Sequence, residues 1–172
     1  MNKTVKEEIF PYHIRDLTTN DISQYNALLR YAFQVTEQDL INAGWQGDEI
    51  KQSKFPVLER ADILGCYDGE TLVSQFAVYP LKMNIYNEIY PIGFVTSVST
   101  YPEYSGKGIM SKLMKKSLSR MREKGQSLAL LYPYSIPLYR NMDGKLYLTR
   151  FLTLLRTGKS PQNQRLREAF TV

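Results

Sequence analysis

The tetrapeptide Ser-Gly-Lys-Gly at residues 105–108 has the composition of a phosphate-binding loop. It lies between an apolar, β-branched run and an amphipathic segment, so we expect it at a junction between a strand and a helix. The first turn of a helix leaves about four amide groups unpaired and carries roughly half a positive charge, which attracts phosphate. Gly106 and Gly108 would let a ligand approach the main chain, and Lys107 would add a cation. The alternative is a tight turn without a ligand, because short glycine motifs are common.

Tyr139 is a second residue that could take part in a reaction. It follows the apolar run "SLALLYPY" at residues 127–134, which predicts a strand buried on both faces. A tyrosine just beyond such a strand, near the mouth of a phosphate loop, is a candidate proton donor with a pKa of about 10. The chain has 13 tyrosines, so an ordinary buried side chain is the alternative.

A long strand and a helix would position the loop. The extended run at residues 89–101 predicts the strand before it, and the segment after Gly106 predicts a helix because its apolar residues recur at helical spacing. That apolar face consists of Ile109, Leu113, Met114, Leu118 and Met121. Gly125 suits the position just after the end of this helix.

The preceding part of the chain predicts further strands and helices. The stretch "YHIRDLTTND" at residues 12–21 predicts a strand with a turn-rich exit, and Thr19, Asn20 or Asp21 can cap the helix that follows. The apolar face of that helix would consist of Ile22, Tyr25, Leu28, Leu29, Ala32 and Phe33. A second short helix should cover residues 37–44. Two antiparallel hairpins should then follow, with turns at Asp68-Gly69 and Asn87-Glu88. The predicted order is β-α-α-β-β-β-α-β, in which a right-handed β-α-β crossover gives a mixed sheet.

The composition limits the class of protein. A chain of 172 residues with 43% hydrophobic and 23% charged residues fits one soluble globular domain. No apolar run reaches the ~18 residues of a membrane span, and the start lacks an apolar signal region, so we expect a cytoplasmic protein. Cys66 and His13 are the only cysteine and histidine, which excludes an internal disulfide and a Cys/His zinc site within this chain. We therefore expect no metal.

The net charge of +5 raises the alternative of nucleic-acid binding. The lysines and arginines between residues 112 and 122 share their helix with Met, Leu and Ile, so a solvated helix face explains them. No aromatic residues are interleaved with these lysines. We therefore expect no nucleic-acid partner, and a steep salt dependence of DNA affinity would contradict that expectation.

The stretches "VTSVSTYP" and "SGKGIM" carry a resemblance to a known family. From about residue 12 to 141 the chain resembles a GNAT-type N-acetyltransferase and, more narrowly, is similar to the Eis (enhanced intracellular survival) group. Matches to the family pattern are Val95, Thr96, Val98, Pro102 and Gly108. Ser105 replaces the usual arginine or glutamine, and Met110 replaces the usual glycine or alanine, which implies weakened but not abolished binding of the cosubstrate.

The resemblance implies a fold, a reaction and a role for each matching residue. The fold would be an α/β GNAT fold with a mixed, mostly antiparallel central sheet flanked by helices. The main chain at Val98, Ser99 and Thr100 would pair with the pantetheine arm of acetyl-CoA. The pyrophosphate would lie on the amides of Gly106, Lys107, Gly108, Ile109, Met110 and Ser111. Tyr134 and Ser135 would flank the thioester, and Tyr139 would protonate the leaving thiolate after direct attack by a primary amine.

The family pattern ends after Asn141, where an aromatic-Gly-aromatic corner and two further strands would follow. Permitted codons for the next residues, read in a shifted frame, can encode "YGWEIISDKISYTIKD", which begins with such a corner. We therefore expect residues 1–141 to be the acetyltransferase core and 142–172 an aberrant tail from a frameshift. The C-terminal strands would be missing, which would leave residues 128–131 as an exposed apolar edge, and the tail would be poorly ordered or loosely helical near 163–170.

Two functions remain open from the sequence. The first is acetyl transfer from acetyl-CoA to a lysine, polyamine, amino sugar or aminoglycoside. The second is an acyl-CoA-binding remnant without turnover. The look-alike group forms hexamers through domains absent here, so we do not expect oligomerisation to carry over.

Overall fold

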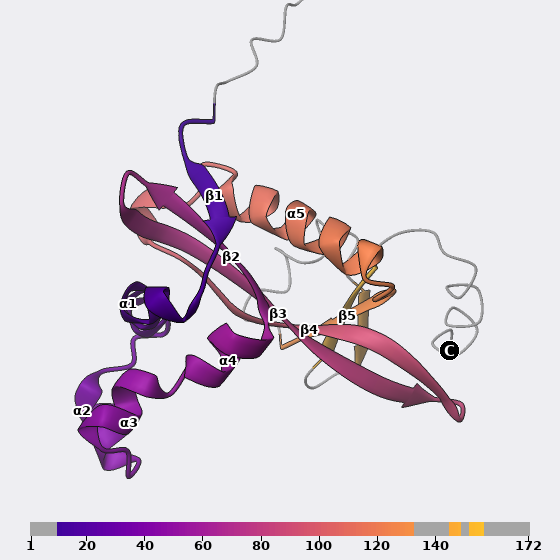
Figure 1. Ribbon diagram of the computed structural model, residues 1–172, viewed down its shortest axis with the longest axis horizontal. Helices are drawn as coiled ribbons and strands as arrows, with labels where there is room; N and C mark the ends of the chain where they lie inside the picture. The colour runs from indigo at the N-terminus through magenta and orange to yellow at the C-terminus, as the bar shows by residue number, and fades with distance from the viewer. Residues whose placement is uncertain (1–9, 133–144, 149–151, 157–172) are drawn as a thin grey trace, which may run out of the picture.

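The protein is described by a computed structural model, in which residues 10–132, 145–148 and 152–156 are placed (Figure 1). The strands are β1 (His13–Asp16), β2 (Asp62–Asp68), β3 (Thr71–Ile85), β4 (Glu88–Thr100), β5 (Leu128–Leu131), β6 (Lys145–Leu148) and β7 (Leu152–Arg156). The helices are α1 (Ile22–Phe33), α2 (Glu37–Asn42), α3 (Gly47–Gln52), α4 (Phe55–Arg60) and α5 (Ile109–Glu123). Short 3₁₀ turns at Thr19–Asp21 and Pro102–Tyr104 precede α1 and α5.

The strands form one sheet in the order β1-β2-β3-β4-β5-β7-β6. Strands β4 and β5 are parallel and joined by α5, whereas the other described pairings are antiparallel. This arrangement confirms the predicted mixed, mostly antiparallel sheet flanked by helices.

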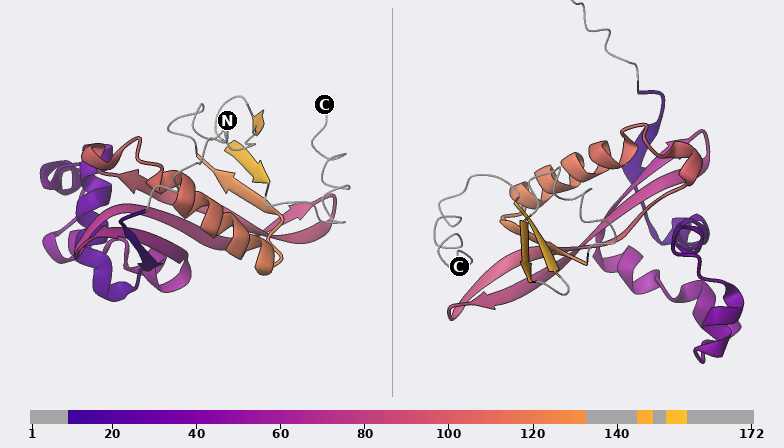
Figure 2. Two further views of the ribbon diagram at one scale, coloured as in Figure 1. Left: turned by 90° about the horizontal axis from the view of Figure 1, so that it is seen from above. Right: turned by 180° about the vertical axis from the view of Figure 1, so that it is seen from behind.

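Helices cover both faces of the sheet (Figure 2). Successive residues of a strand point to opposite faces, so each strand contributes side chains to the packing on both faces. On one face, Leu64 and Phe76 pack with Leu113 and Met114 of α5. On the other face, Ile63, Leu72 and Ala77 pack with residues of α1 and α4. The helix that follows the glycine loop therefore lies on the face opposite α1.

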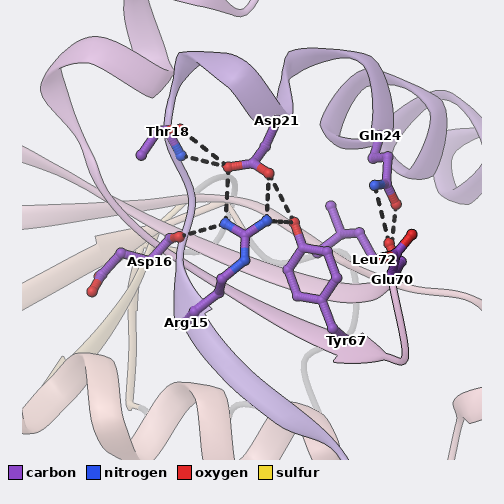
Figure 3. Close-up of polar contacts among 8 residues, drawn as sticks. All are labelled: Arg15, Asp16, Thr18, Asp21, Gln24, Tyr67, Glu70 and Leu72. Carbon is purple, nitrogen blue, oxygen red and sulfur yellow. Dashed lines mark hydrogen bonds and ion pairs between the residues drawn. The ribbon is translucent and has the colours of Figure 1, made fainter.

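A polar cluster fixes the start of α1 against the sheet (Figure 3). The Arg15 guanidinium donates to both carboxylate oxygens of Asp21, at 3.0 and 2.6 Å, and to the Tyr67 hydroxyl at 2.7 Å. Tyr67 in turn donates to Asp21 at 3.0 Å. Further along the helix, the Gln24 side chain accepts from the Leu72 amide at 2.7 Å. These contacts hold α1 in a fixed position over β2 and β3.

Both hairpins form close to the predicted turns, each shifted by one residue. Asp68 pairs with Thr71, so the first loop is Gly69-Glu70. Ile85 pairs with Glu88, so the second loop is Tyr86-Asn87, with φ of 50° and 63°. Positive φ at both central residues is the type I′ geometry that matches the twist of a two-residue hairpin. The sequence analysis did not predict α3 and α4, which fill the connection before β2.

The C-terminal part corrects one expectation. Strand β5 is not an exposed edge, because β7 pairs with it from Leu128↔Arg156 to Leu131↔Thr153, and β6 pairs with β7. Two strands therefore follow β5, where the sequence predicted none. The predicted helical segment near 163–170 lies outside the described residues, and the domain boundary at 141 stays a prediction.

Candidate functional site

Strands β4 and β5 separate partway along their length. They pair only from Ile92↔Leu128 to Val95↔Leu131, whereas β4 continues to Thr100. On this side of β4, no described strand takes up the main-chain groups of residues 96–100. An extended ligand could therefore pair with them as a strand would.

A bulge in β4 lies where the two strands separate. Gln75 pairs with Ser99 and Ala77 with Thr96, so Ser97 and Val98 together oppose one residue of β3. Ser97 has a φ of 53°, a conformation that a residue with a Cβ adopts at a cost of roughly 1–2 kcal/mol. A bulge changes the direction of the side chains and main chain around it.

The glycine loop leads from β4 into the first turn of α5. Gly106 and Gly108 have φ of 75° and 74°, and a Cβ added at either would meet no protein atom within 4 Å. Gly108 is the N-cap of α5 and has no side chain to accept from the helix, whose first described intrahelical bond runs from the Lys112 amide to the Gly108 carbonyl. The amides of residues 109–111 are thus left for an external acceptor.

A cavity of about 500 Å³ lies between the end of β4 and the start of α5. Eight of the predicted site residues line it: Val98, Ser99, Thr100, Gly106, Gly108, Ile109, Met110 and Ser111. The sequence analysis did not assign Phe33 and Tyr104 to the site, although they also line the cavity. Ser105, which it placed in the loop without a binding role, lines the cavity too. Phe33 was predicted in the apolar face of α1, but 46% of its surface is exposed. The position of Phe33 at the end of α1 was the available indication in the sequence that its side chain could lie away from the core.

Lys107 does not line this cavity. Its ammonium lies 4.7 Å from the centre of the Tyr104 ring, and the Tyr104 hydroxyl donates to Asp68 at 2.8 Å. The hydrogen bond to the Asp68 carboxylate raises the pKa of Tyr104. Lys107 is therefore held at the rim, where it can contribute a long-range charge. Met110 packs partly against the core and also lines the cavity.

A second cavity, of about 400 Å³, begins where the first ends along β4. Thr96 and Ser97 line the second cavity, the next three residues of β4 line the first, and Phe33 lines both. The remaining wall of the second cavity consists of residues from α1 together with Val35, Leu40, Ser53 and Lys54. No Asp, Glu or His occurs among the described residues that line either cavity.

Tyr25 lies close to this region but does not supply a base. Its side chain is fully buried, and burial raises the pKa of Tyr25 to about 12. An interaction with the Ser97 side chain lowers this pKa by less than burial raises it. The hydroxyl is therefore protonated at neutral pH and cannot accept a proton from a substrate.

Three predicted site residues, Tyr134, Ser135 and Tyr139, lie outside the described residues. In the described part of the chain, no three His, Cys, Asp or Glu side chains come together to hold a metal. None of the described helices has the length and apolar character needed to span a membrane.

Comparison with known proteins identifies the family. Residues 13–145 match a protein-family model that is described as an acetyltransferase (GNAT) domain. No curated protein matches the sequence significantly. A conserved protein from Enterococcus faecalis V583, described as a probable N-acyltransferase, has 24% identity and a TM-score of 0.70 over 79% of this chain and 33% of its own.

Two other solved structures share the fold. A GNAT family acetyltransferase from Brucella melitensis, in complex with acetyl-CoA, has 20% identity and a TM-score of 0.62, with 87% of this chain and 90% of its own covered. Eis1 from Mycobacterium abscessus has 18% identity and a TM-score of 0.60, with 77% and 31% covered. The chain thus spans about a third of the length of the E. faecalis protein and of Eis1. Since the family model matches well over half of its residues, the chain belongs to the GNAT family of acetyltransferases.

Proposed function

We propose that the chain binds acetyl-CoA in the first cavity and transfers the acetyl group to a primary amine. One observation carries the proposal: the unpaired end of β4 and the uncapped amides of α5 line the same cavity. The pantetheine arm would pair with the main chain of residues 98–100, and the pyrophosphate would accept from the amides of 106–111. The acetyl-CoA complex of the B. melitensis relative supports this choice of ligand.

The acceptor amine would bind in the second cavity. A ligand that follows β4 from Thr100 toward Thr96 passes from the first cavity into the second, so a thioester at its end would face the amine there. Holding the two reactants side by side would supply much of the rate. No carboxylate or imidazole lines the described walls, so the amine would enter in its neutral form. Tyr134 and Ser135 would flank the thioester, and Tyr139 would protonate the leaving thiolate.

The alternative is an acyl-CoA-binding remnant without turnover. Calorimetry with CoA and the release of free thiol in the presence of amines separate the two functions. Binding with thiol release supports the transferase, and binding without it supports the remnant. Absence of CoA binding by folded protein would refute both.

We also propose that the chain is Eis-like within the GNAT family. The sequence motifs at residues 95–102 support that placement, as does the likeness to Eis1. The frameshift after Asn141 remains part of this proposal, and sequencing of the gene tests it. A stop codon within a few codons of Asn141 in the alternative frame would refute it.

A further inference from the structure

The second cavity has a positive lining. Arg30 from the last turn of α1 and Lys54 from the start of α4 both line it, and no carboxylate among the described residues does. The remaining polar lining consists of amide and hydroxyl groups, including Asn26 and Ser53. A binding site of this composition favours a ligand with a negative group.

The polar groups on the α3 side of the cavity are mostly occupied. Arg30 donates to the Ile50 carbonyl at 2.9 Å and Asn26 to the Lys51 carbonyl at 2.8 Å. Ser53 donates to the Ile50 carbonyl at 3.2 Å. These bonds fix the Arg30 guanidinium at the cavity wall while leaving its charge uncompensated by an anion in the described structure.

Lys54 provides the second charge and is not engaged elsewhere. Its side chain is half-buried and makes no hydrogen bond or ion pair with a described residue. A partly buried ammonium is less screened by solvent than one on the surface, so it acts more strongly on a ligand. Two such cations in one cavity repel a substrate with several ammonium groups.

We propose that the acceptor is a small amine that also carries an anionic group, a carboxylate or a phosphate. This inference rests on the proposed function, because it assigns the acceptor to the second cavity. The anionic group binds between Arg30 and Lys54, and the amine points toward Thr96 and Ser97, where β4 leads in from the first cavity. Polyamines and aminoglycosides are poor substrates by the same electrostatic argument.

Matched acceptors test the charge preference on the full chain with CoA binding established first. The four-carbon set is 4-aminobutyrate, butylamine and 1,4-diaminobutane, which differ in the charge at the far end. The α-amino acids and their carboxamides form a second carboxylate set, in which the amine and the carboxylate lie closer together than in 4-aminobutyrate. Phosphoethanolamine and ethanolamine form the phosphate pair, which separates the two possible sources of negative charge. Thiol release gives kcat/KM, and calorimetry on the CoA-bound protein gives amine affinity.

A charge reversal at Lys54 provides the variant. Lys54→Glu should lower the affinity and the kcat/KM for anionic amines about tenfold and raise both for 1,4-diaminobutane. The reason is that the net charge of the cavity lining falls by two units relative to wild type. Lys51→Glu is the matched control: Lys51 lies three residues away, is 77% exposed and pairs with Asp48 rather than lining the cavity. It should leave both classes of amine unchanged.

The outcomes separate the inference from the proposed function. A preference for the anionic member of a pair, reduced or inverted by Lys54→Glu but not by Lys51→Glu, supports the inference. If CoA binds but 1,4-diaminobutane or the neutral amines have the same kcat/KM and affinity as the anionic amines, the inference is wrong and the acetyltransferase proposal stands. Failure of every anionic amine to bind the CoA-bound protein likewise overturns the inference. Absence of CoA binding overturns the function itself.

Discussion

Substitution of Gly108 by alanine tests whether the first turn of α5 binds the pyrophosphate. Gly108 has a φ of 74°, so alanine there costs about 1 kcal/mol of folding free energy. For a protein of this size, about 1 kcal/mol lowers Tm by roughly 2–4 °C. The added methyl group meets no protein atom within 4 Å, and Gly108 lines the cavity, so the methyl occupies space that a phosphate would use.

The expected loss of affinity follows from the contacts that would be displaced. A hydrogen bond from an amide to a charged phosphate contributes about 1.5–3 kcal/mol. Losing one such bond raises the Kd for CoA about ten- to a hundredfold. Calorimetric titration of folded Gly108→Ala with CoA measures this change, and thermal unfolding without ligand measures the change in stability separately.

Gly125 provides a control within the same helix. It follows the C-terminal end of α5 with a φ of 72°, and a Cβ there also meets no atom within 4 Å. The two glycines lie about 25 Å apart along the helix at 1.5 Å per residue, and Gly125 does not line the cavity. Gly125→Ala should therefore lower Tm by a similar amount and leave the Kd for CoA unchanged. Equal CoA affinity in the two variants would refute the assignment of the pyrophosphate to this turn.

Three further changes test other parts of the structure. Asp21→Asn should lower the free energy of unfolding by about 1–2 kcal/mol at pH 7 in urea titrations, a range limited by the 40% exposure of Arg15. The Arg15 hydrogen bonds lower the pKa of Asp21 from 3.8 to about 2, so the wild type alone should lose this stabilisation as the pH falls from about 4 toward 2; an identical pH dependence in the variant would contradict this. Gly93→Ala places a Cβ 2.5 Å from the Met121 Cε atom and 2.6 Å from the Val78 Cγ1 atom, and it should cost about 1–3 kcal/mol in the same assay. When Met121→Ala is already present, the extra cost should be smaller but not zero, because the contact with Val78 remains. Tyr139→Phe should lower kcat about a hundredfold without changing the Kd for CoA, whereas unchanged thiol release would exclude it as the acid.

The glycine loop was predictable because its signal is local. The change from a strand pattern to a helix pattern within residues 95–118 predicts the junction, and the glycines predict an open main chain there. Gly125 likewise ends α5 where the sequence places it, with a φ of 72°. The position of the Lys107 side chain could not be predicted from spacing alone, because its contact with the Tyr104 ring depends on the conformation of the loop.

The bulge and the second cavity could not be predicted, because they depend on pairing between distant segments. The bulge at Ser97 appears only when the register of β3 against β4 is known. The second cavity combines Arg30, Lys54 and Thr96 from three separate parts of the chain. Strand β7 was missed for a related reason: pairing with β5 assigns it to the sheet, while its own residues lack a clean alternation.

Backbone strain distinguishes the region of the second cavity from the rest of the described fold. Among the described residues, four other than glycine have a positive φ, and two of these, Tyr86 and Asn87, form a hairpin turn that requires it. Gln34, with a φ of 54°, ends α1 as its C-cap, a position where the left-handed conformation is common. The remaining residue is Ser97, which lines the second cavity from the bulge in β4. Its conformation costs roughly 1–2 kcal/mol, and such strain clusters at functional sites because the surrounding structure must enforce it. The strain at Ser97 therefore supports, independently of charge, the assignment of this cavity to the acceptor.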